Sequence, residues 1–145
     1  MKEKIIDLIA LAPAVIASGL SIYVLAASKP APGKLPIHHD LNGMADSFGT
    51  FVAVWGGLIL PSLLVIFISF IFIWIFPGYR CRPIPMCDSI ITGLLLGLTI
   101  KVVPMLKAHT HPGLTLRDWR TIILIGLGFF LLSIGMQYLF FKVFI

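Results

Sequence analysis

Apolar residues fall in four long stretches along the chain, and short segments rich in polar residues separate them. The apolar stretches cover about residues 5–27, 50–76, 84–106 and 116–144. Each is long enough for an α-helix to cross a bilayer, which takes about 20 mostly apolar residues. The pattern therefore predicts an all-α integral membrane protein, a four-helix transmembrane bundle in which residues 1–145 form a single domain.

The order of the four stretches also predicts which polar segments share a side of the membrane. The segments 28–49 and 107–115 follow the first and third helices, so both are expected on the same face. The segment 77–85 and the two termini are expected on the opposite face. We therefore expect a bundle with two polar loops on one face, and these loops hold all four histidines.

Composition and charge support a membrane location. Residues of the chain are 59% hydrophobic and 12% charged, and the mean hydropathy is +1.04. The first stretch, Ile5–Ala27, has a basic start like a signal peptide but is longer than the usual apolar region of one, so we expect a retained helix. The net charge is +5, but the basic residues are scattered over the helix ends, which indicates contact with lipid headgroups and no nucleic-acid partner. They divide almost evenly between the two sides, so they do not predict an orientation.

Several local signals predict how the helices begin, bend and pack. Pro13 predicts a kink in the first helix. Asp46 or Ser47 is expected to cap the second helix. The pair Thr115 and Asp118 fits a capping box at the start of the fourth helix.

The third helix carries two features that concern its neighbours. Gly93 and Gly97 have the spacing that lets another helix approach closely, and we expect Gly126, Gly128 and Gly135 to give the fourth helix a thin packing face. Lys101 lies near the end of the third helix, and we expect its ammonium group to reach the interface. Cys81 and Cys87 are separated by five residues and are expected to be inert thiols.

The most specific text in the chain is LPIHHDLNGMADSFGTF. It contains Pro36-x-His38, Asn42-Gly43 and Asp46-x-Phe48-Gly49. This text resembles the signature loop of a bacterial and archaeal membrane family, the uncharacterised domain at the N-terminus of SdpI-type immunity proteins. The match covers about residues 34–50 and extends loosely to 5–76.

The resemblance implies a location in the prokaryotic plasma (inner) membrane and no established catalytic activity. It assigns a binding or loop-pinning role to the matching residues Pro36, His38, Asn42, Gly43, Asp46 and Phe48. His39 and Thr50 depart from the family pattern. We expect His38 to bond to Asp46 or to a backbone carbonyl and to hold the loop against the helix ends.

The histidines leave a second interpretation open. His38, His39, His109 and His111 are expected on one face with Asp40, Asp46 and Asp118, and imidazole with carboxylate suits zinc. No ligand spacing typical of a catalytic metal site is present. We therefore expect interfacial histidines and no cofactor, with zinc as the alternative.

Other chemistry has little support in the sequence. No nucleophile elbow, phosphate-binding loop or dinucleotide fingerprint occurs. We expect no acidic residue in a helix interior, so carrier function is not favoured. We therefore expect a small non-enzymatic membrane protein, an SdpI-like immunity or accessory protein that binds a membrane-active peptide or a partner membrane protein. Two alternatives stay open: a metal-binding or metal-dependent membrane enzyme that uses the histidines, and a structural subunit of a larger membrane complex.

Overall fold

The computed structural model describes residues 1–27, 35–42, 45–49, 51–76, 82–108 and 114–144, and for 35–39, 45–49, 51–55 and 105–108 it describes the backbone alone. Its elements are α1 (Lys2–Ala10), α2 (Ala12–Ala27), β1 (Leu35–His39), β2 (Ala45–Gly49), α3 (Phe51–Ile75), α5 (Pro83–Ala108) and α6 (Leu116–Phe144).

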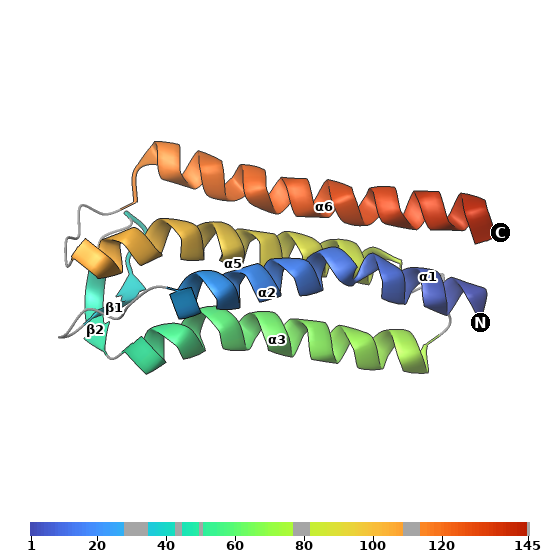
Figure 1. Cartoon of the computed structure of the whole chain (residues 1–145), viewed down its shortest axis with the longest axis horizontal. Coiled ribbons are helices and arrows are strands. Elements are labelled where there is room, and N and C mark those ends of the chain that lie inside the picture. The colour runs from blue at the N-terminus through green and yellow to red at the C-terminus, as the bar shows by residue number, and fades with distance from the viewer. Residues whose placement is uncertain (28–34, 43–44, 50, 77–81, 109–113, 145) are drawn as a thin grey trace.

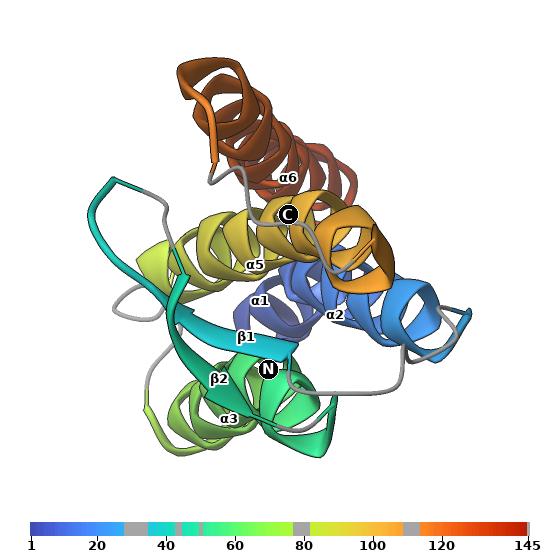
Figure 2. The same cartoon turned by 90° about the vertical axis from the view of Figure 1, so that its left-hand side faces the viewer.

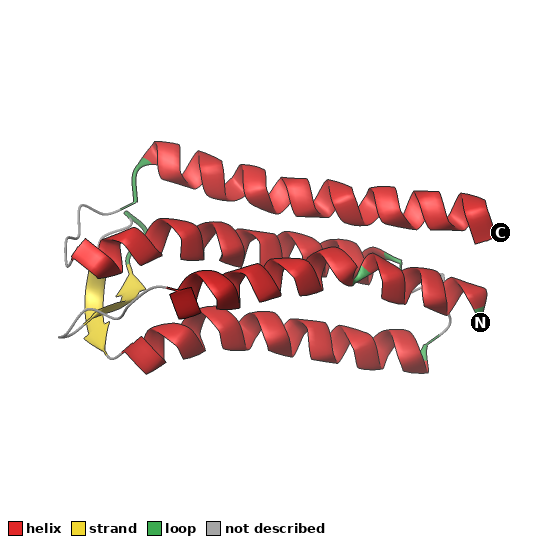
Figure 3. Ribbon diagram, in the orientation of Figure 1, coloured by secondary structure: helices red, strands yellow, loops and turns green. Residues whose placement is uncertain are grey.

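The helices run side by side along the long axis of the molecule, with both termini at one end and the two strands at the other (Figures 1 and 3). Seen from the strand end, α6 lies at one edge and α3 at the other, with α5 and the α1–α2 pair between them (Figure 2). The two middle elements therefore make most of the helix–helix contacts, and α5 packs against α2, α3 and α6.

Four segments of the described chain are long and apolar enough to cross a membrane: Lys2–Ala27, Gly56–Ile75, Pro83–Pro104 and Leu116–Phe144. They coincide with the four predicted stretches, and the loop face is at the end opposite the termini (Figure 1). The predicted all-α, four-helix membrane architecture is confirmed, and the chain is a multi-pass membrane protein.

The first span is interrupted at Leu11, between α1 and α2. Pro13 has no N–H group, so it cannot donate to the carbonyl of Ile9 four residues earlier. The chain tightens there, and the N–H of Leu11 donates to the carbonyl of Leu8 at 3.2 Å. The interruption lies two residues before Pro13, where the sequence predicts a kink, and the bend itself stays a prediction.

Small and hydroxyl-bearing side chains fill much of the space between the helices. The buried hydroxyls are Ser18, Ser21, Ser62, Ser69, Ser89, Thr92, Thr99 and Ser133. Several donate within their own helix: Ser89 to Pro85 at 2.7 Å and Thr99 to Leu95 at 2.8 Å, for example. Others connect helices: Ser18 and Ser62 share a hydrogen bond, and Ser133 donates to the carbonyl of Ala10 at 3.0 Å. Small residues let membrane helices approach closely, which is the main source of attraction between them.

Glycines set the close approach of α5 and α6. A Cβ added at Gly97 would lie 2.9 Å from the Cα of Ile122, and one added at Gly93 would lie 3.0 Å from the Cα of Gly126. The predicted role of Gly93 and Gly97 is confirmed. The thin face expected on α6 is only partly used, because a Cβ at Gly128 or Gly135 would meet no described heavy atom within 4 Å.

The first polar loop folds back on itself as an antiparallel pair of strands, β1 and β2. A turn lies at Leu41–Asn42, where the N–H of Asn42 donates to Oδ1 of Asp40 at 2.9 Å. The predicted cap of the second helix is wrong. Asp46 and Ser47 lie in β2, and α3 begins only at Phe51.

The capping box at the start of α6 is confirmed. The carboxylate of Asp118 accepts from the Thr115 N–H at 2.9 Å and from its hydroxyl at 2.8 Å. The N–H of Asp118 donates to the Thr115 hydroxyl at 3.3 Å. This reciprocal arrangement satisfies two amides that a helix start leaves without partners.

Candidate functional site

The strand pair brings the residues of the matched loop motif close together. Pro36 lies opposite Phe48, His38 opposite Ser47 and His39 opposite Ala45, with irregular register on both sides of His38. Asn42 is exposed at the turn. Gly43 lies outside the described residues, and only the backbone of His38 and Asp46 is described, so the pairing of these two side chains stays a prediction.

The structure does not describe the side chains on which the zinc alternative depends. His109 and His111 lie outside the described ranges, and the side chains of His38 and His39 are not described. Within the described part of the chain, no group of three or more histidine, cysteine or acidic residues is placed to hold a metal. Cys87 is a free and exposed thiol, while Cys81 lies outside the described ranges.

At the opposite end of the bundle, the structure corrects the expectation that no acidic residue lies inside a helix. Asp7 on α1 is 1% exposed and Asp88 on α5 is 4% exposed. Each lies within a candidate membrane span, and each has one carboxyl oxygen, Oδ2, with no hydrogen-bond partner among the described residues. A buried polar atom without a partner is costly, so both oxygens call for an explanation. Ionisable residues inside membrane segments commonly mark functional sites.

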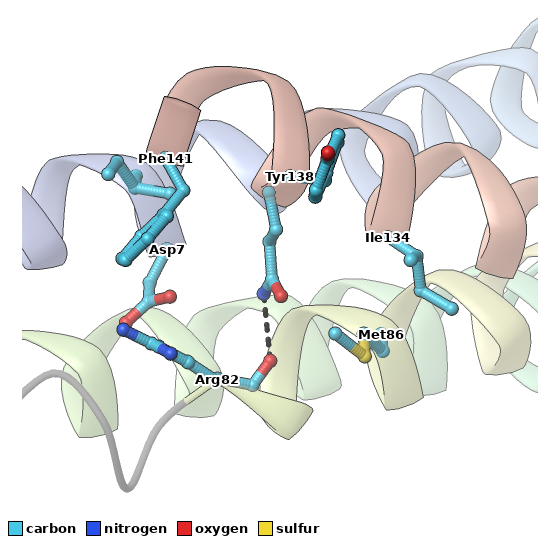
Figure 4. A pocket seen from close by; sticks show the side chains of 8 residues that line it. Asp7, Arg82, Met86, Ile134, Tyr138 and Phe141 are labelled. Carbon is cyan, nitrogen blue, oxygen red and sulfur yellow. Dashed lines mark hydrogen bonds between the residues drawn. The ribbon is translucent and has the colours of Figure 1, made fainter. Parts of the chain in front are cut away.

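Asp7 lines an open pocket of about 300 Å³ between α1, α5 and α6 (Figure 4). Four residues of α6 line this pocket, and they share one face of the helix because they are spaced three or four residues apart. The lining residues are Ile6, Asp7, Arg82, Met86, Ile134, Gln137, Tyr138 and Phe141. The pocket is therefore mainly apolar, with one acid, one base and one amide.

Arg82 is the counterpart of Asp7 in this pocket. The Asp7 carboxyl and the Arg82 guanidinium point toward one another (Figure 4). The guanidinium also lies 3.9 Å from a carboxyl oxygen of Glu3 and 5.0 Å from the ring centre of Phe141. The backbone carbonyl of Arg82 accepts a hydrogen bond from Nε2 of Gln137 at 2.8 Å. These contacts fix Arg82 at the mouth of the pocket while its side chain stays 45% exposed.

The depth of Asp7 follows from the length of its helix. The span Lys2–Ala27 has 26 residues, which is about 39 Å at 1.5 Å per residue. A hydrocarbon core is about 30 Å thick, so each end extends about 4 Å beyond it. Asp7 is five residues from Lys2, about 7.5 Å from the helix end. The pocket therefore lies where hydrocarbon meets lipid headgroups.

Asp88 belongs to a different part of the bundle. It does not line the pocket of Asp7, and the hydroxyl of Ser69 on α3 is placed to hydrogen-bond its carboxyl. Its backbone carbonyl accepts from the Thr92 hydroxyl at 2.7 Å. Asp88 is therefore enclosed in the hydroxyl-rich interior between α3 and α5.

A sequence signal for both acids exists in the spacing of small residues. Asp7 precedes the buried residues Ala10, Ala14 and Ala17 at intervals of three or four, so it shares their helix face. Asp88 shares a face in the same way with Thr92 and Thr99. A stripe of small residues marks the side of a membrane helix that packs on other helices.

The fold and this pocket define a multi-pass membrane protein that carries an acid–base pair at the edge of the hydrocarbon. Comparisons of the chain with family models, with curated proteins and with solved structures found no match.

Proposed function

We propose that this chain is a small non-enzymatic protein of the prokaryotic plasma membrane, an immunity or accessory protein of the SdpI type, that acts by holding another membrane component in the Asp7 pocket. The observation that carries this proposal is Oδ2 of Asp7, which is buried beside an open pocket and has no hydrogen-bond partner among the described residues. A donor from a bound component would satisfy this oxygen.

The composition of the pocket also supports binding. Ligand sites are mostly apolar with a few convergent polar groups, and Ile6, Met86 and Ile134 surround Asp7 and Arg82 in this way. The position at the edge of the hydrocarbon gives access to components that lie in the bilayer. The resemblance of the loop motif to SdpI-type proteins supports the immunity or accessory role.

Native mass spectrometry of the full chain, extracted in a mild detergent, tests this proposal. We expect a bound component whose occupancy falls in Asp7→Asn, which removes the acid, and in Ile134→Trp, which fills the pocket. Two matched controls should retain it: Asp88→Asn changes a buried acid elsewhere, and Leu131→Trp enlarges an exposed position of the same helix. Equal occupancy in all five proteins would contradict the proposal.

A further inference from the structure

Building on the proposed function, we infer that the pocket takes the headgroup of a phospholipid that carries both a phosphate and a primary ammonium group, as phosphatidylethanolamine does. On binding, the Asp7 carboxyl would turn its buried Oδ2 toward the ammonium, which would donate to it, and the phosphate would lie against the guanidinium of Arg82. One acyl chain would follow the apolar wall of Ile134 and Met86.

Charge complementarity selects this class of ligand. The pocket offers one acid and one base side by side, and the exposed Tyr138 lies on its wall. A purely anionic lipid would satisfy Arg82 and leave Asp7 facing a phosphate. A purely cationic ligand would face the guanidinium. A zwitterion with the two charges a few bonds apart matches both groups.

Donor chemistry narrows the choice further. Oδ2 of Asp7 has no hydrogen-bond partner among the described atoms, so it needs an N–H or O–H donor. A primary ammonium has three N–H donors, whereas the methylated ammonium of a choline headgroup has none. Arginine binds phosphate through its planar fork of donors, and 45% of the Arg82 side chain remains accessible.

Depth supports a lipid over a component dissolved in water. Asp7 lies close to the boundary between hydrocarbon and headgroups, as the helix length shows. The exposed Tyr138 lines the same pocket, and tyrosine rings settle at this level of a membrane. A phospholipid would bring its phosphate and its ammonium to this depth without leaving the bilayer.

A purely structural pair of Asp7 and Arg82 is the competing explanation. It would hold the start of α5 against α1 and show no preference among lipids. In that case Asp7→Asn would lower stability equally in every lipid. Selectivity among headgroups is therefore the readout that separates the two explanations.

The test uses the delipidated full chain in detergent and three lipids with identical acyl chains: phosphatidylethanolamine, phosphatidylcholine and phosphatidylglycerol. Binding to each is measured by native mass spectrometry and by the shift in thermal unfolding. We expect phosphatidylethanolamine to bind about tenfold more tightly than the other two, a ratio equal to about 1.4 kcal/mol. Asp7→Asn should abolish this preference, Arg82→Gln should weaken all three lipids, and Asp88→Asn should keep the preference.

Equal binding of the three lipids to the unaltered chain, or a preference that survives Asp7→Asn, would overturn the lipid inference. If Ile134→Trp still displaces a component of another chemistry, such as a peptide, the proposed function stands without its lipid. If Asp7→Asn, Ile134→Trp and Leu131→Trp all bind every component as the unaltered chain does, both the proposed function and the lipid inference fail. Should Asp7→Asn not fold, loss of the headgroup preference in Ile134→Trp but not in Leu131→Trp supports the lipid inference, and a preference that survives in both overturns it.

Discussion

Lys101 of α5 reaches the carboxylate that caps α6: its Nζ lies 3.2 Å from Oδ1 of Asp118. The Oδ2 of the same carboxylate accepts from Thr115. Asp118 is in the first turn of α6, so the pair lies at the loop end of the bundle, where both side chains are partly exposed. The ammonium group of Lys101, which we expected to reach the membrane interface, thus pairs with Asp118.

The two roles of Asp118 predict unequal effects of two substitutions. Asp118→Ala removes the carboxylate half of the capping box and the ion pair, and we expect it to lower the free energy of unfolding by about 1–2 kcal/mol. Lys101→Met removes only the ion pair, so its cost should stay below about 1 kcal/mol. Denaturant titration in mixed micelles measures both, with the exposed Arg117→Ala as a control. Equal costs for the two changes would show that the cap contributes little.

The close approach of α5 and α6 makes Gly97 sensitive and Gly128 tolerant. Gly97→Ala places a Cβ 2.9 Å from the Cα of Ile122, and we expect a loss of roughly 1–3 kcal/mol from overpacking. Gly128→Ala makes the same chemical change where no described heavy atom lies within 4 Å of the new Cβ. The free energy of unfolding of the Gly128→Ala variant should be unchanged or slightly higher. A loss at Gly128 as large as that at Gly97 would argue against the observed packing.

The hydrogen bond between Ser18 and Ser62 predicts non-additive behaviour. Hydrogen bonds between membrane helices average about 0.6 kcal/mol and reach about 1.7 kcal/mol. Ser18→Ala and Ser62→Ala each leave a buried hydroxyl without its partner, whereas the double variant leaves none. We therefore expect the double variant to cost less than the sum of the single variants. Ser21→Ala is the control, because Ser21 donates to Ala17 of its own helix. Strict additivity would contradict a direct bond.

The loop motif carries a prediction of its own. We expect His38 and Asp46 to bond, with a contribution of roughly 1.5–3 kcal/mol if the bond involves a charged group. Unfolding measurements on His38→Ala, Asp46→Ala and the double variant should then show coupling, and His39→Ala should have a smaller effect. If losing His109 or His111 were as harmful as losing His38, and a chelator reproduced the defect, a metal site would replace the pinning role.

The features that the sequence predicted correctly depend on neighbouring residues. A run of apolar residues defines a span whatever its partners, and the Thr115–Asp118 cap is complete within four residues. Gly93 and Gly97 predict that another helix packs closely on α5, because small side chains at this interval have few other uses in a membrane helix.

The features that it missed depend on contacts between distant segments. Asp46 and Ser47 suit a helix cap, but they lie in β2, because β1 pairs with Ser47 through His38 and with Ala45 through His39, on either side of Asp46. Asp7 is only five residues inside its helix, a position that by itself fits an exposed helix start. Its burial follows from the packing of α5 and α6 around that face of α1.

The hydroxyls of the interior also determine how the chain can assemble. Ser21, Ser89, Thr92 and Thr99 each donate to a carbonyl of their own helix, so these groups need no second helix when a span enters the bilayer. Other bonds form only when a second helix is present, among them Ser18–Ser62, Ser133–Ala10 and Ser69–Asp88. The four hydroxyls that donate within their own helix therefore add no requirement for a neighbouring helix during insertion, and the bonds between helices form afterwards, when the inserted spans meet.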